Sequence, residues 1–207
     1  PALSRAAASP GELRPTFRRM FELTCLLGLP ICFAGALWTR DIVLALLGAQ
    51  WIEAIPILRL LFIAALPRML GVCTGWVYVA TGRPGRMLTW QLFWTPFIVL
   101  AFVLGLSYGA VGVAAAYAIA NWIGVIPNYL YCFSGTPIVL RDIGSSLIRP
   151  LACTAICIAV GTFLPAIVLA GHPQSAGPAR LAARFSVALG TYAVVTALFI
   201  PFVHDKV

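Results

Sequence analysis

The chain has 207 residues, of which 61% are hydrophobic and 10% are charged, and its mean hydropathy is +0.97. Soluble domains carry about 25% charged residues, so a soluble protein of this length could not hide so much apolar surface in one core. The net charge of +8 comes from basic residues scattered at segment ends, and this scatter disfavours a nucleic-acid partner. Composition therefore predicts an integral membrane protein.

The first 19 residues are polar and basic, and we expect them to form a cytoplasmic segment. The apolar runs that follow are continuous rather than alternating, which favours helices over barrel strands. The run at residues 41–51 is too short to cross a bilayer and is expected to lie along the outer interface. The predicted fold class is all-α, a transmembrane bundle without a soluble domain. A helix needs about 20 residues to cross a bilayer. Six apolar runs are close to this length and are predicted to be spans, at residues 20–39, 55–80, 88–106, 110–133, 147–170 and 183–203.

Basic residues are unevenly divided between the two sides of this arrangement. One side holds Arg5, Arg14, Arg18, Arg19, Arg83, Arg86, Arg141, Arg149 and Lys206. The other side holds Arg40, Arg180 and Arg184. The positive-inside rule therefore predicts that the first side, with both termini, is cytoplasmic. Tryptophan and tyrosine prefer the boundary between membrane and water, because their rings have a polar edge. We expect Trp38, Trp51 and Tyr108 at the outer boundary and Trp76, Tyr78, Trp90 and Tyr131 at the inner boundary.

Residues with potential for catalysis or metal binding form no recognisable motif. The six cysteines lie in apolar stretches, outside any CxxC pair and away from histidine, so they are interpreted as small hydrophobic side chains rather than disulfides or metal ligands. His172 and His204 lie in a loop and at the C-terminus without a serine–acid pattern. We therefore expect no enzyme activity, metal or cofactor. Because the chain starts at Pro1, without a methionine or a charged leader, it is expected to be a piece of a longer protein.

Arg68 is the most unusual residue, because it lies near the middle of the second span. An arginine at that depth costs about 2.5–3.5 kcal/mol on insertion scales, so it should face a water-filled cavity or an anionic partner. In one interpretation its guanidinium binds a phosphate-bearing substrate. In the other it pairs with backbone carbonyls at a kink caused by Pro67.

The fourth span carries a polar stripe on one helical face, because Tyr117, Asn121, Gly124 and Asn128 recur at intervals of three and four residues. This face either lines a hydrophilic cavity or bonds to a neighbouring helix, and Gln91 in the third span could do either. The predicted substrate-binding residues are Arg68, Tyr117, Asn121, Asn128 and Gln91.

Three further features have ordinary structural interpretations. Arg59 should point away from Arg68 and reach the outer interface. Glu22 is expected to pair with Arg18 or Arg19, with proton coupling as the alternative. The pair Gly71 and Gly75 has the spacing that allows close helix contact.

Several stretches of residues 1–135 share a pattern with a known family: PALSR, LLGAQWIEAIPILRLL, VATGRPGR and YGAVGVAAAYAIA. With them the chain resembles bacterial polysaccharide flippases, the Wzx-like lipopolysaccharide and exopolysaccharide exporters of the multidrug/oligosaccharidyl-lipid/polysaccharide superfamily. The most specific part surrounds Trp51, Pro56 and Arg59.

This resemblance implies two pseudo-symmetric lobes around a cationic cavity in the bacterial inner membrane. Such proteins move undecaprenyl-diphosphate-linked oligosaccharides from the inner to the outer leaflet by alternating access. On this mapping residues 20–135 are four helices of the C-terminal lobe, residues 136–207 add two helices, and the N-terminal lobe is a missing partner. Arg68 would meet the diphosphate or acidic sugars of the lipid-linked substrate.

Two alternatives remain open at the level of sequence. An ion-coupled multidrug exporter of the same superfamily would be expected to carry acidic residues within its spans, where Glu22 comes nearest. A polytopic glycan polymerase or acyltransferase would be expected to have a large external loop with essential arginine or histidine residues.

Overall fold

The computed structural model describes residue 3, residues 11–168 and residues 177–199, without the side chains of residues 165–168, 177–181 and 194–199. All regular elements in this part of the chain are helices, which confirms the all-α fold class. They are α2 (Leu13–Leu37), α3 (Thr39–Leu46), the 3₁₀ helix η1 (Ala49–Ala54), α4 (Ile55–Ala80), α5 (Pro84–Leu106), α6 (Gly109–Phe133), α7 (Leu140–Val168) and α8 (Gly177–Phe199).

Helix lengths agree with most of the predicted spans. By length and composition, five helices of the described part could cross a membrane: Leu13–Leu37, Ala49–Ala80, Pro84–Leu106, Gly109–Phe133 and Leu140–Leu164. The sixth predicted span overlaps α8, although its residues 200–203 lie outside the described part. The run at 41–51 forms the short helix α3 and the start of η1. Helix α2 begins at Leu13, seven residues before the start predicted for the first span.

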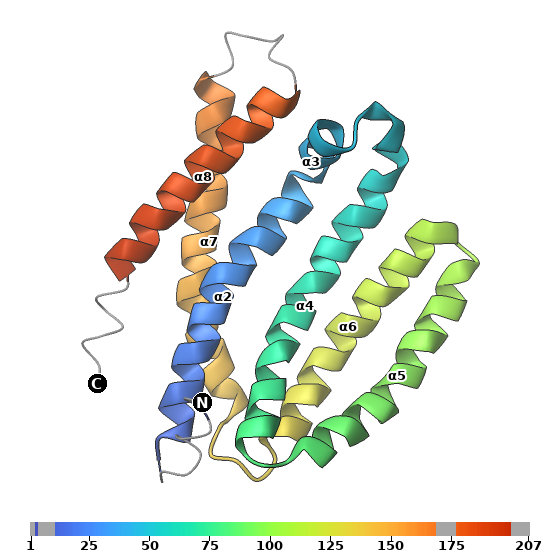
Figure 1. Ribbon diagram of the computed structural model, residues 1–207, viewed down its shortest axis with the longest axis vertical. Helices are drawn as coiled ribbons and strands as arrows, with labels where there is room; N and C mark the ends of the chain where they lie inside the picture. The colour runs from blue at the N-terminus through green and yellow to red at the C-terminus, as the bar shows by residue number, and fades with distance from the viewer. Residues whose placement is uncertain (1–2, 4–10, 169–176, 200–207) are drawn as a thin grey trace.

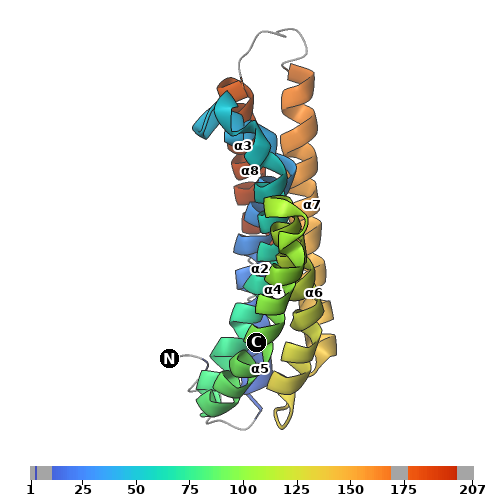
Figure 2. The same cartoon turned by 90° about the vertical axis from the view of Figure 1, so that its right-hand side faces the viewer.

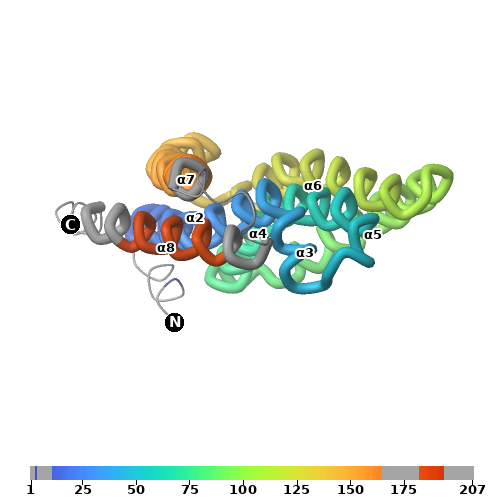
Figure 3. The backbone as a smooth tube through the Cα atoms, turned by 90° about the horizontal axis from the view of Figure 1, so that it is seen from above, coloured from blue at the N-terminus to red at the C-terminus, as the bar shows by residue number. Residues whose placement is uncertain are grey.

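The long helices contact one another in the order α8, α7, α2, α4, α6, α5, so they form a layer rather than a closed bundle (Figures 1 and 3). Figure 2 shows that they run along the long axis of the molecule. The start of α2, the α4–α5 turn and the α6–α7 connection share one end, which is lowest in Figure 1. We call this the basic end, because the start of α2, the α4–α5 turn with the start of α5, and the first third of α7 carry Arg14, Arg18, Arg19, Arg83, Arg86, Arg141 and Arg149.

The core lies where α2, α4 and α6 meet. Phe21, Cys25, Cys73 and Val77 are each 0% exposed there. All six cysteines are buried and free, which confirms their interpretation as hydrophobic side chains. In contrast, Gly105 is the one buried residue of α5, so this helix presents its apolar side chains to the surroundings. Such a surface suits lipid rather than water.

Two glycines of α2 allow it to approach α4 closely. A Cβ atom added at Gly28 would overlap the side chain of Met69, and one added at Gly35 would overlap the ring of Phe62. The two glycines lie seven residues apart, as do their two partners on α4, so both contacts fall on one line where the helices meet. Small residues have this role in membrane helices because packing, not exclusion of water, drives their association.

A polar seam joins α2 to α7 near the basic end. Arg14 donates two hydrogen bonds of 2.8 Å to the carboxylate of Asp142, whose side chain is 3% exposed. The backbone N–H of Val139 also donates to this carboxylate, at 3.0 Å. One helical turn further along α2, Arg18 donates to the hydroxyl of Ser145 at 3.0 Å. We define the α2–α7 seam as the contacts of Arg14, Arg18 and Glu22 with Asp142, Ser145, Ser146 and Arg149.

Glu22 belongs to this seam, and the partner predicted for it is wrong. Its carboxylate pairs with Arg149 of α7 at 3.8 Å. Arg18 is one turn before Glu22, but its guanidinium extends to the serines of α7 instead. The side chain of Glu22 is 16% exposed, so an ion pair between helices accounts for its charge.

Candidate functional site

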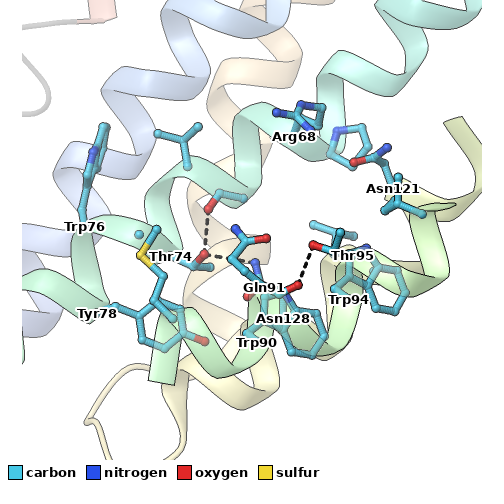
Figure 4. Close-up of a pocket in the computed structure, with 18 of the residues that line it drawn as sticks. Arg68, Thr74, Trp76, Tyr78, Trp90, Gln91, Trp94, Thr95, Asn121 and Asn128 are labelled. Carbon is cyan, nitrogen blue, oxygen red and sulfur yellow. Dashed lines mark hydrogen bonds between the residues drawn. The ribbon is translucent and has the colours of Figure 1, made fainter. Parts of the chain in front are cut away.

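A cavity of about 570 Å³ lies between α4 and α5, and residues of α6 line its third side (Figure 4). Helices α4 and α5 each pack along α6. They have few contacts with each other, so a space remains between them. The walls come from Pro67, Arg68, Gly71, Val72, Thr74, Gly75, Trp76 and Tyr78 of α4, Met87, Trp90, Gln91, Trp94, Thr95 and Ile98 of α5, and Tyr117, Asn121, Gly124, Val125 and Asn128 of α6.

All five side chains predicted from sequence as substrate contacts line this one cavity: Arg68, Gln91, Tyr117, Asn121 and Asn128. They come from three helices, so the structure unites residues that the sequence could place only on separate spans. Their role as substrate contacts stays a prediction. Arg59, in contrast, is exposed and does not line the cavity, in agreement with its expected direction.

Arg68 is held at the cavity wall by one tyrosine. Its Nη1 atom donates a hydrogen bond of 2.9 Å to the hydroxyl of Tyr117, and its Cζ atom lies 6.0 Å from the centre of that ring. The Tyr117 ring is itself stacked on Phe102, with 5.5 Å between ring centres. The ion pairs of the described residues join Arg14 to Asp142, Arg149 to Glu22 and Arg184 to Asp41. Arg68 therefore keeps its charge and most of its donors available to a ligand.

The polar stripe of α6 both lines the cavity and bonds to other groups. The Asn128 amide donates at 3.0 Å to the hydroxyl of Thr74 on α4, and that hydroxyl donates at 2.7 Å to the carbonyl of Gly71. The Asn121 amide donates at 2.7 Å to the carbonyl of Tyr117 on its own helix. The two sequence interpretations of this stripe are therefore compatible with each other.

The predicted close contact through Gly71 and Gly75 is wrong. A Cβ atom at Gly71 would meet Asn128 at 3.9 Å, and one at Gly75 would meet Met87 at 3.9 Å, so both positions are open. The glycine that does allow close contact here is Gly124 of α6, where a Cβ atom would overlap the ring of Trp94. Gly71 and Gly75 instead leave room inside the cavity.

Three tryptophans of the cavity wall were not among the predicted contacts. Trp76 and Trp90, which we expect near the inner boundary, also line the cavity, together with Trp94. Trp90 and Trp94 are stacked, with 5.5 Å between ring centres and 8° between planes. A signal existed in the sequence, because residues 90, 91, 94, 95 and 98 recur at the spacing of one helical face.

The side chains of this site can bind a ligand through charge, hydrogen bonds and ring stacking. The cavity wall contains one charged residue, Arg68, together with amides, hydroxyls and indoles. The described residues contain no group of three or more histidine, cysteine or acidic side chains able to hold a metal. His172 and His204 lie outside the described residues. A cationic, polar and aromatic cavity within apolar helices suits an anionic, polar ligand that could not otherwise enter the membrane.

Comparisons with known proteins agree with this chemistry. A family described as "Polysaccharide biosynthesis protein" matches residues 1–56. The lipopolysaccharide biosynthesis protein WzxC of Escherichia coli (strain K12) is 25% identical over 130 residues, which cover 62% of this chain and 26% of WzxC. Both matches show a likeness to proteins of polysaccharide biosynthesis. Together with the apolar helices, they support a membrane protein of polysaccharide biosynthesis.

The chain spans about a quarter of the length of WzxC. No solved structure gave a significant match.

Proposed function

We propose that this chain forms part of an exporter that flips undecaprenyl-diphosphate-linked oligosaccharide from the inner to the outer leaflet. The single observation that carries the proposal is Arg68, a mid-membrane guanidinium on the wall of a polar cavity without a carboxylate partner in the described part of the chain. A guanidinium can bind two phosphate oxygens at once. The resemblance to WzxC adds independent support.

The depth of Arg68 matches this task. It lies about midway along α4, roughly 18 Å from either end at 1.5 Å per residue. A diphosphate cannot cross hydrocarbon unaided, because it would leave its hydration behind. A cationic group at mid-depth stabilises the phosphate where water is scarcest, and thus lowers the barrier to crossing.

The same cavity favours an anionic substrate over the cationic drugs of the alternative exporter. None of its lining residues is Asp or Glu. A site for a cationic drug, or for a coupling ion, would be expected to present a carboxylate. We therefore place the lipid-linked glycan ahead of the ion-coupled multidrug substrate.

In this proposal the chain supplies the C-terminal part of a two-lobed protein of the inner membrane. An N-terminal lobe forms the opposite wall of the pathway, and alternating access moves the site between the two faces. The arginines of the basic end favour a cytoplasmic position for that end and for both termini. The coding sequence before Pro1 tests this part, because about eight further apolar spans are expected there, whereas a soluble catalytic domain would contradict it.

The direct test is Arg68→Ala in the full-length protein. Export of lipid-linked glycan should be lost in cells and in reconstituted vesicles, while membrane insertion and protein level stay unchanged. Arg59→Ala is the matched control, because it makes the same truncation and removes a positive charge from the same helix outside the cavity. Normal export by Arg68→Ala would remove Arg68 from the mechanism and, with it, the argument for this substrate.

A further inference from the structure

The cavity extends from Arg68 in one direction only. On α4 all lining residues except Pro67 follow Arg68 in the chain, up to Tyr78, and α4 runs toward the basic end. Helix α6 also runs toward that end, and its lining residues begin at Tyr117 and end at Asn128. The Arg68–Tyr117 pair therefore stands near one end of the cavity, and most of its volume lies between this pair and the basic end.

This remaining volume has an aromatic and uncharged wall. The stacked rings of Trp90 and Trp94 form one side on α5, and Trp76 lies on the opposite side, on α4 (Figure 4). The carboxamide of Gln91 is exposed and forms no side-chain hydrogen bond with the described residues. These groups offer flat apolar surfaces next to a hydrogen-bonding amide.

Gly75 leaves this part of the cavity open. It lies seven residues after Arg68, hence on the same face of α4 and roughly 10 Å nearer the basic end. Any side chain at this position would extend into the cavity, because only Met87 lies within reach of an added Cβ atom, at 3.9 Å. The missing side chain therefore provides space rather than helix contact.

We propose that this volume is a separate subsite for the sugar next to the diphosphate, with Trp94, Gln91 and Gly75 as its determinants. The inference rests on the proposed function, since Arg68 holds the diphosphate in it. A sugar ring has an apolar C–H face and a rim of hydroxyls. The C–H face packs on an indole ring, and the hydroxyls bond to an amide such as Gln91. Gly124 positions Trp94, because it allows the indole to lie directly against α6.

The test compares two defined lipids with the full-length protein in detergent. One is undecaprenyl diphosphate, and the other is the same lipid carrying a single glucose. The wild-type protein should bind the glucosylated lipid about tenfold more tightly. Gly75→Leu and Trp94→Leu should abolish this preference without changing the affinity for the bare lipid, whereas Trp94→Phe should retain part of it.

Two controls separate this inference from the function on which it rests. Gly144→Leu adds the same side chain at an exposed glycine of α7 with nothing within 4 Å of its added Cβ atom, and should leave both affinities unchanged. Arg68→Gln should weaken binding of both lipids, because both carry the diphosphate. Loss of binding to both lipids in Arg68→Gln would support the diphosphate site whatever the tryptophan variants show.

The sugar subsite would be overturned by a wild-type protein that binds both lipids equally. It would also be overturned if Trp94→Leu weakened both lipids alike, since that result would assign the aromatic wall to the polyprenyl chain. An unchanged preference in both Gly75→Leu and Trp94→Leu would place the sugar elsewhere.

Discussion

Arginines occur inside both halves of the helix layer, but their surroundings differ. In the α2–α7 seam, Arg14 meets a buried carboxylate, Arg18 meets serine hydroxyls and Arg149 meets Glu22. In the cavity, Arg68 meets the hydroxyl of Tyr117 and faces open space. An arginine that is paired within the chain joins two helices of the fold, whereas one left with free donors at mid-depth is available to a ligand.

Glycines show the same division. Gly28 and Gly35 lie where α2 and α4 touch, and neither has room for a Cβ atom. Gly71 and Gly75 lie on the cavity wall, where a Cβ atom would fit. One pair of glycines therefore brings two helices together, and the other keeps space between two helices.

Asp142→Ala should have the largest effect on the stability of the fold. It removes the acceptor of both Arg14 bonds and of the Val139 N–H bond, and leaves these donors without their buried partner. The thermal midpoint of the full-length protein in detergent should fall by several degrees. Glu53→Ala, at an exposed acidic position of η1, is the control and should melt like the wild type. An unchanged midpoint in Asp142→Ala would show that the seam does not hold α7 against α2.

Gly35→Ala and Gly75→Ala test the two kinds of glycine with the same added methyl group. Gly35→Ala should destabilise by about 1–3 kcal/mol, because the methyl overlaps the ring of Phe62. Gly75→Ala should stay within about 0.5 kcal/mol of the wild type, since its neighbour lies at 3.9 Å. Denaturant unfolding of the full-length protein measures both. Equal losses would refute the distinction between contact and cavity glycines.

Tyr117→Phe should have the smallest effect. It removes the hydrogen bond to Arg68 but keeps the ring that stacks on Phe102. Because this bond is exposed, affinity for undecaprenyl diphosphate should fall by only about twofold, near the lower limit for a hydrogen bond. Binding in detergent, next to Arg68→Gln, gives the comparison. A loss as large as that of Arg68→Gln would make the tyrosine hydroxyl an essential part of the anion site.

The sequence by itself determined the class of the protein, most of its spans and the polar positions within them. Long apolar runs predict membrane helices, because lipid offers no hydrogen bonds and the backbone N–H and C=O groups must bond to one another. Helical periodicity is local, so it correctly placed Tyr117, Asn121, Gly124 and Asn128 on one face of α6. An arginine amid apolar residues was visible in the same way, without knowledge of its neighbours.

Only the tertiary structure decided which faces meet. Arg14 and Asp142 are 128 residues apart, and nothing in either segment indicates their pairing or that of Glu22 with Arg149. The role of Gly71 and Gly75 depends on how far α5 lies from α4, and the role of Trp94 on its contact with Gly124. The physical reason is that the contacts of a side chain across helices depend on the order and register in which helices pack, and these arise from the whole layer rather than from any one span.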